Sequence, residues 1–361
     1  MKNFFRNKNI LVTGHTGFKG TWLSIWLKSL GAKVFGYSLC PPTTPSIFET
    51  VTMRDHLDGS IEADIRDLNK LKSYLEQISP DIVFHLAAQS LVRLSYQRPV
   101  ETFETNVLGT VNVLEAFTAC KSARICVGIT SDKCYENREC EYAYRENDPM
   151  GGHDPYSASK GCAEIVASSW RRSYFPPDKF EQHTKALATA RAGNVIGGGD
   201  WAKDRIIPDI IRSLSSHTPI QIRNPLAIRP WQHVLEAIGG YLMLAQKLWN
   251  NPTDYSGGWN FGPPSNSTVN VLEIAKKCAE LWGSGDIQHS FAEKNMSAHE
   301  ANFLKLDSSK ATDLLGWKSV LNVTEAIDWT ISWYKKFYAG NDNMFDCTAA
   351  QIKSFSDKGA L

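Results

Sequence analysis

The 361-residue sequence has no marked excess of either charge, because 39 basic and 38 acidic residues give a formal net charge of +1. It has no block of like charges of the kind typical of nucleic-acid arms or of patches that bind anionic membranes. We therefore expect neither nucleic acid nor a membrane among its partners. The eight cysteines include no Cys-x-x-Cys pair and no Cys/His cluster at metal-ligand spacing. This distribution predicts reduced thiols and disfavours both a disulfide framework and a metal site.

Long apolar runs are also missing. Residues 1–6 lead directly into an apolar run that is too short for the core of a signal peptide, and no later segment approaches the length of a membrane span. We therefore expect a cytoplasmic protein. The chain is long enough for a large core, and it contains no internal repeat or low-complexity segment.

A glycine-rich stretch near the N-terminus is the first strong feature that is present. Residues 9–20 read Asn-Ile-Leu-Val-Thr-Gly-His-Thr-Gly-Phe-Lys-Gly, so Gly14, Gly17 and Gly20 follow a short apolar run at intervals of three. Apolar residues at helical spacing come next, which predicts a strand, a tight turn and a helix. Glycines let such a turn approach a pyrophosphate at the positive end of the helix. The same spacing occurs in ordinary strand-to-helix turns, so the dinucleotide interpretation depends on later residues.

Strand and helix patterns alternate through the first half of the chain, which predicts an α/β protein with a doubly wound parallel Rossmann sheet. The expected strands are residues 10–12, 33–37, 61–65, 81–86, 125–129 and 186–192. The expected helices are residues 20–30, 68–77, 99–119, 156–174 and 208–214. Proline-containing residues 40–60 are expected to form a long loop. We place an NAD-binding domain at 1–193 and a smaller, mainly substrate-binding C-terminal lobe at 194–361, some segments of which return to the first domain.

The second expected strand lacks a residue common in NAD-binding units. An acidic residue often ends this strand and holds the adenosine ribose, but here the strand ends Gly36-Tyr37-Ser38-Leu39. Ser38 can contact either a ribose hydroxyl or a phosphate. The residues therefore leave NAD and NADP open, and we expect NAD with weakened binding.

A tyrosine and a lysine supply the second strong feature. The strand at 125–129 runs into Thr130-Ser131-Asp132-Lys133, and Tyr156 and Lys160 lie four residues apart on one face of an expected helix. A phenol has an ordinary pKa of about 10, and we expect the neighbouring ammonium to lower the pKa of Tyr156. The pair then suits removal of a proton from a sugar hydroxyl while a nicotinamide takes the hydride. Tyr-x-x-x-Lys often occurs by chance, and the glycine loop and the strand end favour the catalytic interpretation here.

These motifs resemble a known superfamily. Thr13-Gly14-x-x-Gly17-x-x-Gly20, His85-Leu86-Ala87-Ala88, Thr130-Ser131-Asp132 and Tyr156-x-x-x-Lys160 are similar to the extended short-chain dehydrogenase/reductases, in their sugar-nucleotide branch. The longer strings at 130–135 and 151–164 resemble the CDP-glucose 4,6-dehydratase family. The resemblance implies conversion of CDP-D-glucose to CDP-4-keto-6-deoxy-D-glucose with retained NAD, on the way to dideoxy sugars of bacterial surface polysaccharides such as the lipopolysaccharide O antigen.

The resemblance also implies roles for particular residues. The catalytic set is Ser131, Asp132, Lys133, Tyr156 and Lys160. The cofactor-binding set is Gly14, Thr16, Gly17, Phe18, Lys19, Gly20, Ser38, Asp64, Ile65, Leu86, Ala87, Ala88, Thr130, Tyr156 and Lys160. The substrate-binding set is Gln89, Asn194, Arg205 and Arg229, where the planar guanidinium groups suit phosphate oxygens. Family members pair through helices that correspond to 99–119 and 156–174, which implies a homodimer or homotetramer with a four-helix interface.

Lys133 departs from the pattern of the related dTDP-glucose dehydratases. Their strand end reads Thr-Asp-Glu, and the Glu takes the C5 proton, whereas Lys133 stands at that position here. An amine accepts a proton only when it is neutral, and burial and neighbouring positive charges favour the neutral form. We expect Lys133 to be the C5 base. The alternative is a charged Lys133 that only stabilises the enolate.

Two other functions remain open at the level of sequence. A nucleotide-sugar 4-epimerase shares the glycine loop and the Tyr/Lys pair, but it has no need of the Asp132-Lys133 pair. A non-catalytic dinucleotide-sensing protein would have no need of Tyr156. Trp201 and Trp231 could stack on a nucleobase, but a role in the core is our expectation for both.

Overall fold

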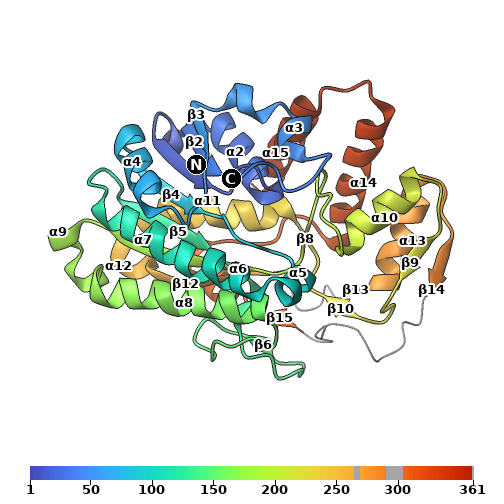
Figure 1. Ribbon diagram of the computed structural model, residues 1–361. Coiled ribbons are helices and arrows are strands. Elements are labelled where there is room, and N and C mark those ends of the chain that lie inside the picture. The colour runs from blue at the N-terminus through green and yellow to red at the C-terminus, as the bar shows by residue number, and fades with distance from the viewer. Residues whose placement is uncertain (264–268, 290–303, 360–361) are drawn as a thin grey trace.

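A seven-stranded parallel sheet forms the centre of the computed structural model, which describes residues 1–263, 269–289 and 304–359 (Figure 1). The strand order is β12-β7-β5-β4-β1-β2-β3, and every pairing is parallel. The strands are β1 (Asn9–Thr13), β2 (Lys33–Ser38), β3 (Gly59–Glu62), β4 (Ile82–His85), β5 (Ile125–Ile129), β7 (Ala186–Ala192) and β12 (Gly257–Phe261). The predicted α/β class and parallel Rossmann sheet are confirmed.

The winding of the sheet reverses at β1. From β1 the order continues through β2 and β3 to one edge, and through β4, β5 and β7 toward the other. Thr13 at the end of β1 is level with Tyr37 of β2 and His85 of β4. A ligand of such a sheet binds in the crevice at the carboxyl ends of the strands at this switch point.

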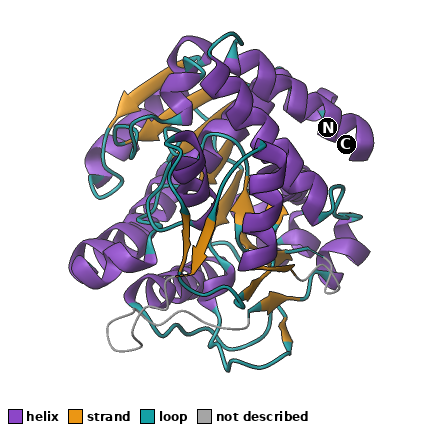
Figure 2. Cartoon of the chain, turned by 90° about the vertical axis from the view of Figure 1, so that its right-hand side faces the viewer, coloured by secondary structure: helices purple, strands orange, loops and turns teal. Residues whose placement is uncertain are grey.

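Helices cover both faces of the sheet, as Figure 2 shows. One face packs against α4 (Leu68–Ile78), α7 (Gly109–Ala119) and α8 (Pro155–Ser173). The other face packs against α2 (Phe18–Ser29) and α11 (Val234–Asn250), and α15 (Met344–Gly359) packs on α2. Successive residues of β1 point to opposite faces, so Leu11 belongs to the first core and Ile10 and Val12 to the second. Because both faces are buried, the strand reads as a continuous apolar run.

The region expected to be a long loop is more ordered than its prolines predicted. It contains α3 (Ile47–Thr50) and the short 3-10 helix η1 (Met53–His56). The third strand is also two residues earlier than expected, because Gly59–Glu62 pairs residue for residue with the end of β2. The prolines precede Ser46, whose hydroxyl caps α3 by accepting a hydrogen bond from Glu49 N at 3.2 Å.

The helix expected at 99–119 consists of three consecutive segments. They are α6 (Pro99–Phe103), the π-helical turn η2 (Glu104–Leu108) and α7. The next helix, α8, begins as its sequence predicts: Pro155 occupies the first turn, and the Asp154 carboxylate caps the helix by accepting from Ser157 N at 2.9 Å. This cap determines where Tyr156 lies, one residue inside the helix.

The second half of the chain contributes a smaller group of elements, drawn at the right of Figure 1. They include α10 (Ile206–Ser215), β9 (Ile220–Ile222), α13 (Val271–Trp282) and β14 (Ile287–His289), with β14 paired to β9. Short pairs join β10 (Ile228–Arg229) to β13 (Val269–Asn270), and β11 (Gln232–His233) to β8 (Val195–Ile196).

Both tryptophans expected in the core are buried there. Trp201 is 5% exposed and Trp231 is 6% exposed. Trp201 packs edge-on against Trp333 and Phe337 of α14 (Val323–Ala339). Among the described helices, none is both long and apolar enough to cross a membrane.

Candidate active site

The glycine loop forms a close turn between β1 and α2. Gly14 has a φ of +75°, and its N–H donates to Tyr37 O at 2.9 Å. A Cβ on Gly14 would lie 2.7 Å from Ala87 N, and a Cβ on Gly20 would lie 2.1 Å from Gly14 O. Both contacts are with backbone atoms, so only glycine fits at these positions.

This turn is suited to a dinucleotide. Gly17 is the residue before α2, and a Cβ there would meet only Gly14 O, at 3.3 Å. The first turn of α2 has no acidic residue, so the positive end of the helix is not neutralised locally. On the neighbouring strand end, Leu86 N and Ala87 N both donate to Thr13 Oγ1 at 3.2 Å. The backbone at the switch point therefore offers a cradle for a pyrophosphate.

The polar side chains expected to contact the adenosine end already have partners within the protein. The hydroxyl of Ser38 lies 2.8 Å from that of Thr16, and Thr16 Oγ1 donates to Leu39 O. Asp64 forms an ion pair with Arg66 at 2.7 Å, and hydrogen bonds from Arg66 hold the pKa of Asp64 below its ordinary value. Ile65 is buried.

Three predicted catalytic residues lie together at the end of β5. The Ser131 hydroxyl donates to Asp132 Oδ1 at 2.9 Å and also forms a hydrogen bond with Tyr156. Asp132 is only 2% exposed, and within the described ranges its Oδ2 has no hydrogen-bond partner. Residues 131, 132 and 156 thus form one buried polar group.

The predicted lowering of the tyrosine pKa is wrong for the protein alone. Burial raises the pKa of Tyr156 to about 12, although the hydrogen bond to Ser131 and the positive charge of Arg205 oppose the rise. Lys160 is itself buried, and this burial lowers its pKa to about 8, partly offset by the negative charge of Glu164. Desolvation therefore outweighs the effect that proximity of the two side chains predicted.

Lys19 extends from the glycine loop toward the same group. Burial, followed by the charge of Arg205, lowers the pKa of the Lys19 amine to about 8, while Asp132 raises it. Lys19 was expected only as a cofactor contact. In the structure the charges of Asp132 and Lys160, two predicted catalytic residues, also act on this amine.

Lys133 lies beside the buried group and contacts it through its backbone. Its backbone N–H donates to Ser131 Oγ at 3.3 Å, within the short 3-10 helix η3 (Asp132–Cys134). The residue is partly exposed, so the burial that was expected to favour a neutral amine is not found. Among the contacts of the described residues, the Lys133 amine has no hydrogen bond or ion pair.

The expected substrate residues have different environments. Gln89 Nε2 donates to Leu91 O and Thr102 Oγ1, so this side chain shapes its own turn. Arg205 pairs with Asp200 at 2.8 Å and donates to Ser90 at 3.1 Å.

The other two substrate candidates belong to short strands of the smaller group. The backbone oxygen of Asn194 accepts from Gln232 N at 3.2 Å, and Arg229 lies in β10. The positive charge of Arg205 acts on Tyr156, the predicted catalytic base.

A buried asparagine that was not predicted from the sequence links the turn at Gln89 to α8, the helix that carries Tyr156. Asn106, in the π-helical turn η2, donates to Gln89 O at 2.9 Å and to Ser159 Oγ at 2.8 Å. Ser159 in turn donates to Tyr156 O at 2.7 Å. The sequence did contain a signal for this residue, because Asn106 is a polar residue on the apolar face of the helix expected at 99–119.

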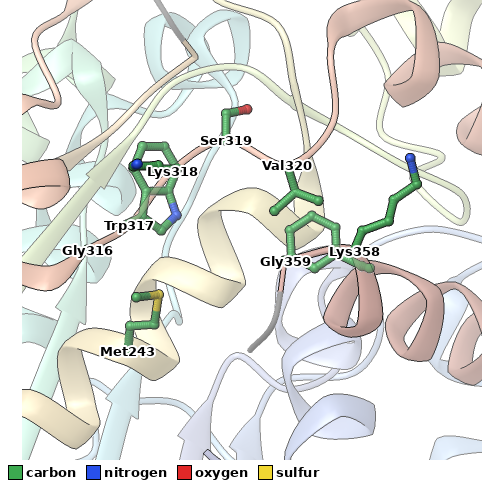
Figure 3. Close-up of a pocket in the computed structure, with 9 residues that line it drawn as sticks. Met243, Gly316, Trp317, Lys318, Ser319, Val320, Lys358 and Gly359 are labelled. Carbon is green, nitrogen blue, oxygen red and sulfur yellow. The ribbon is translucent and has the colours of Figure 1, made fainter.

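A hollow of about 430 Å³ lies away from this site, between α11, α15 and the loop at 316–320 (Figure 3). Its lining includes Met243, Trp317, Val320 and Lys358, and none of the predicted site residues. Lys358 is paired with Glu325 at 2.9 Å. The chemistry described above therefore does not involve this hollow.

Comparison with known proteins agrees with the geometry. The family model described as GDP-mannose 4,6 dehydratase matches residues 11–330. A CDP-glucose 4,6-dehydratase from Salmonella typhimurium is 51% identical over 354 residues, which cover 98% of each chain.

Solved structures share the architecture. The UDP-glucose 4-epimerase of Thermotoga maritima superposes with a TM-score of 0.75 at 20% identity, over 91% of this chain and 99% of that one. The protein MoeE5, in complex with UDP-glucose and NAD, superposes with the same TM-score at 25% identity, over 91% and 99% of the two chains. The fold is therefore shared with an epimerase, whereas the 51% sequence identity is to a dehydratase. The chain belongs to the nucleotide-sugar 4,6-dehydratase family of the extended short-chain dehydrogenase/reductases.

Proposed function

We propose that this protein is a hydro-lyase that converts CDP-D-glucose to CDP-4-keto-6-deoxy-D-glucose with bound NAD. The observation that carries the proposal is the buried Asp132, one oxygen of which accepts from Ser131 while the other has no partner among the described residues. A 4-epimerase has no need of an acid at this place, whereas loss of a C6 hydroxyl requires one. The whole-length relative from Salmonella typhimurium supports the choice of CDP-glucose.

The first step is oxidation at C4 of the glucose. NAD, when bound, accepts the C4 hydride and later returns it to C6, so there is no net oxidation. Tyr156 takes the proton of the C4 hydroxyl, and Ser131, which already shares a hydrogen bond with it, orients that hydroxyl. Because burial holds the pKa of Tyr156 at about 12, the reaction depends on nearby positive charge to favour the phenolate. Lys160 and Arg205 are the groups we assign to this task.

The second step is loss of water across C5 and C6. The C4 ketone acidifies the C5 proton, and we assign its removal to Lys133 in its neutral form. Asp132 then donates a proton to the C6 hydroxyl, which departs as water, and C5 regains a proton from Lys133 when the hydride returns to C6. If Lys133 remains charged, it stabilises the C5 enolate instead, and another group must take the proton.

The nucleotide part of the substrate needs cationic partners. Arg205 and Arg229 are assigned to the diphosphate, because planar guanidinium groups donate pairs of charge-assisted hydrogen bonds to phosphate oxygens. Arg205 is paired with Asp200 in the protein alone, so phosphate would compete with that carboxylate. Gln89 and Asn194 are assigned to sugar contacts.

Reaction in deuterated water tests the proposal. With CDP-glucose and NAD, the expected product has lost its C6 hydroxyl and carries solvent deuterium at C5, as NMR can establish. Separate reactions with dTDP-, UDP- and GDP-glucose should be slower. A C4 epimer without deuterium at C5 would establish the epimerase instead, and absence of turnover with every nucleotide sugar, despite bound NAD, would indicate a dinucleotide-sensing protein.

We also propose a homodimer, or a tetramer built from it, through α6, η2, α7 and α8. These helices carry apolar side chains that are largely exposed in the single chain, among them Val100 (69%), Leu108 (56%), Ile165 (58%) and Tyr174 (54%). Leu108→Glu combined with Ile165→Glu should give a monomer by light scattering. A wild-type protein that is monomeric at micromolar concentration would contradict the proposal. We likewise propose that the first domain ends at residue 193 and that the protein is cytoplasmic.

A further inference from the structure

A buried polar cluster, which consists of Thr130, Glu164, Thr189 and Arg191, lies behind the catalytic residues. Glu164 Oε1 accepts from Thr130 Oγ1 at 2.5 Å, and Oε2 accepts from Thr189 Oγ1 at 2.8 Å and from Arg191 Nη2 at 2.8 Å. The side chains of Glu164 and Arg191 are only 2% and 5% exposed. One carboxylate thus joins α8 to the end of β5 and to β7, all at the site.

Glu164 is charged in this cluster. Burial alone would raise its pKa, but the charge of Arg191 and the hydrogen bonds from Arg191, Thr130 and Thr189 outweigh burial, and the pKa lies below its ordinary value. Lys160 and Glu164 are four residues apart on α8, hence on the same face. Among the charges that act on Lys160, Glu164 is the largest that favours the ammonium form.

We propose that Glu164 is a positioning residue of the reaction: its buried carboxylate keeps Lys160 charged and holds the strand end that carries Ser131 and Asp132 against α8. The inference rests on the proposed function, because it concerns the charge that Lys160 supplies to Tyr156. It assigns a role to a residue outside the predicted catalytic, cofactor-binding and substrate-binding sets. The direct link to the strand end is the hydrogen bond from Thr130, which immediately precedes Ser131.

Other charged or titratable groups face Lys160 from the surrounding elements. They are Cys134 of η3, Lys19 of α2 and His85 of β4. His85 is neutral at working pH, because burial lowers its pKa to about 3. Burial also raises the pKa of the Cys134 thiol, which is therefore neutral too. Glu164 is consequently the main negative charge that opposes the effect of burial on Lys160.

A purely structural ion pair is the competing explanation. Arg191 also donates to Tyr135 OH at 2.7 Å and to Glu146 O at 3.0 Å, so it stabilises contacts other than the ion pair with Glu164. If the pair served only stability, loss of either partner would have the same kind of effect, because each leaves an uncompensated buried charge. Our proposal predicts that loss of Glu164 lowers the pKa of Lys160, whereas loss of Arg191 does not.

Titration of Lys160 in the resting protein separates these explanations. Because Lys160 is buried, its titration is followed by NMR of the lysine side chains in isotopically labelled protein, with exposed Lys353 as reference. Glu164→Gln should lower the midpoint by about one pH unit or more, because an opposite charge has been removed. Arg191→Gln should not lower it, and Thr189→Val, which removes a hydrogen bond but no charge, should leave it unchanged. An unchanged midpoint in folded Glu164→Gln would overturn the proposal.

A kinetic measurement provides the second readout. In single turnovers with CDP-glucose, Glu164→Gln should slow NAD reduction and move its alkaline limb to lower pH by the same amount as the titration, with KM little changed. If Glu164→Gln does not fold, Glu164→Gln/Arg191→Gln leaves no unpaired buried ion, and its Lys160 midpoint should lie below that of Arg191→Gln alone. Equal midpoints in these two variants would refute the role. If wild type fails to convert CDP-glucose, the proposed function is wrong, but the titration still decides the inference about Glu164.

Discussion

Two alanine substitutions in the glycine loop should have different consequences, because the two Cβ atoms would meet different surroundings. At Gly20 the Cβ would lie 2.1 Å from Gly14 O, 2.8 Å from Gly14 C and 2.8 Å from His15 Cα. Relief to an ordinary contact of 3.4 Å requires the loop to open by about 1.3 Å, the difference between 3.4 and 2.1 Å. At Gly17 the single close atom is Gly14 O at 3.3 Å, which needs a shift of about a tenth of an ångström.

These distances lead to different free energies of unfolding. Overpacking of a buried site costs typically 1–3 kcal/mol, and more when only backbone can move, so we expect Gly20→Ala to lose about 3 kcal/mol or more. Gly17→Ala should lose less than about 1 kcal/mol, because its Cβ points toward open space. In that space the pyrophosphate of NAD is expected to lie, so Gly17→Ala should still bind NAD at least tenfold more weakly.

Chemical denaturation gives the stabilities, and calorimetric titration with NAD gives the affinities. The two variants should dissociate the properties: Gly20→Ala loses both stability and NAD binding, whereas Gly17→Ala loses NAD binding alone. Native NAD affinity in Gly17→Ala would refute our assignment of the loop as the pyrophosphate cradle. A stability of Gly20→Ala within about 1 kcal/mol of wild type would refute the packing argument.

Three further predictions concern other parts of the molecule. Lys133→Met should still reduce NAD with CDP-glucose in a single turnover, but it should neither exchange the C5 hydrogen with solvent nor release water; exchange at near the native rate would remove Lys133 from the catalytic residues. The purified protein should carry less than one equivalent of NAD, and added NAD should stimulate its activity. The reason is that Ser38, which is hydrogen-bonded to Thr16, stands where many NAD-binding proteins have a carboxylate, whose hydrogen bonds to the ribose contribute about 1.5–3 kcal/mol each. Full occupancy by NAD would contradict this. Burial raises the pKa of Glu236 from 4.5 to about 7, so the folded state holds its proton more tightly than the unfolded state, and stability should fall as pH rises from 4.5 to 7. Denaturation curves measured between pH 4.5 and 7 should show a smaller loss of stability in Glu236→Gln than in wild type. An equally large loss in the variant would show that Glu236 is not its source.

Much of the sheet was predictable because its strands are buried on both faces. Ile125–Ile129 and Ala186–Ala192 were expected at the bounds that the structure gives them. A central parallel strand reads as an unbroken apolar run, so the local sequence alone identifies it. The same holds for the start of α8, where Asp154 and Pro155 mark the first turn.

The edges of the sheet were not predictable in this way. The strand β12 (Gly257–Phe261) was missed because it begins with two glycines and follows a long excursion into the smaller group of elements. Its pairing with β7 depends on a partner about 70 residues earlier in the chain. The register of β3 likewise follows from β2 and not from its own residues.

The sequence by itself determined the fold class, the glycine turn and the presence of Tyr156 and Lys160 on one face of a helix, because these depend on spacing along a single segment. Only the tertiary structure decided how the two side chains behave. Burial raises the pKa of Tyr156 and lowers that of Lys160, and the charges that oppose these shifts come from Arg205 and Glu164. Desolvation and electric fields are sums over elements that are distant in sequence, so no local pattern contains them.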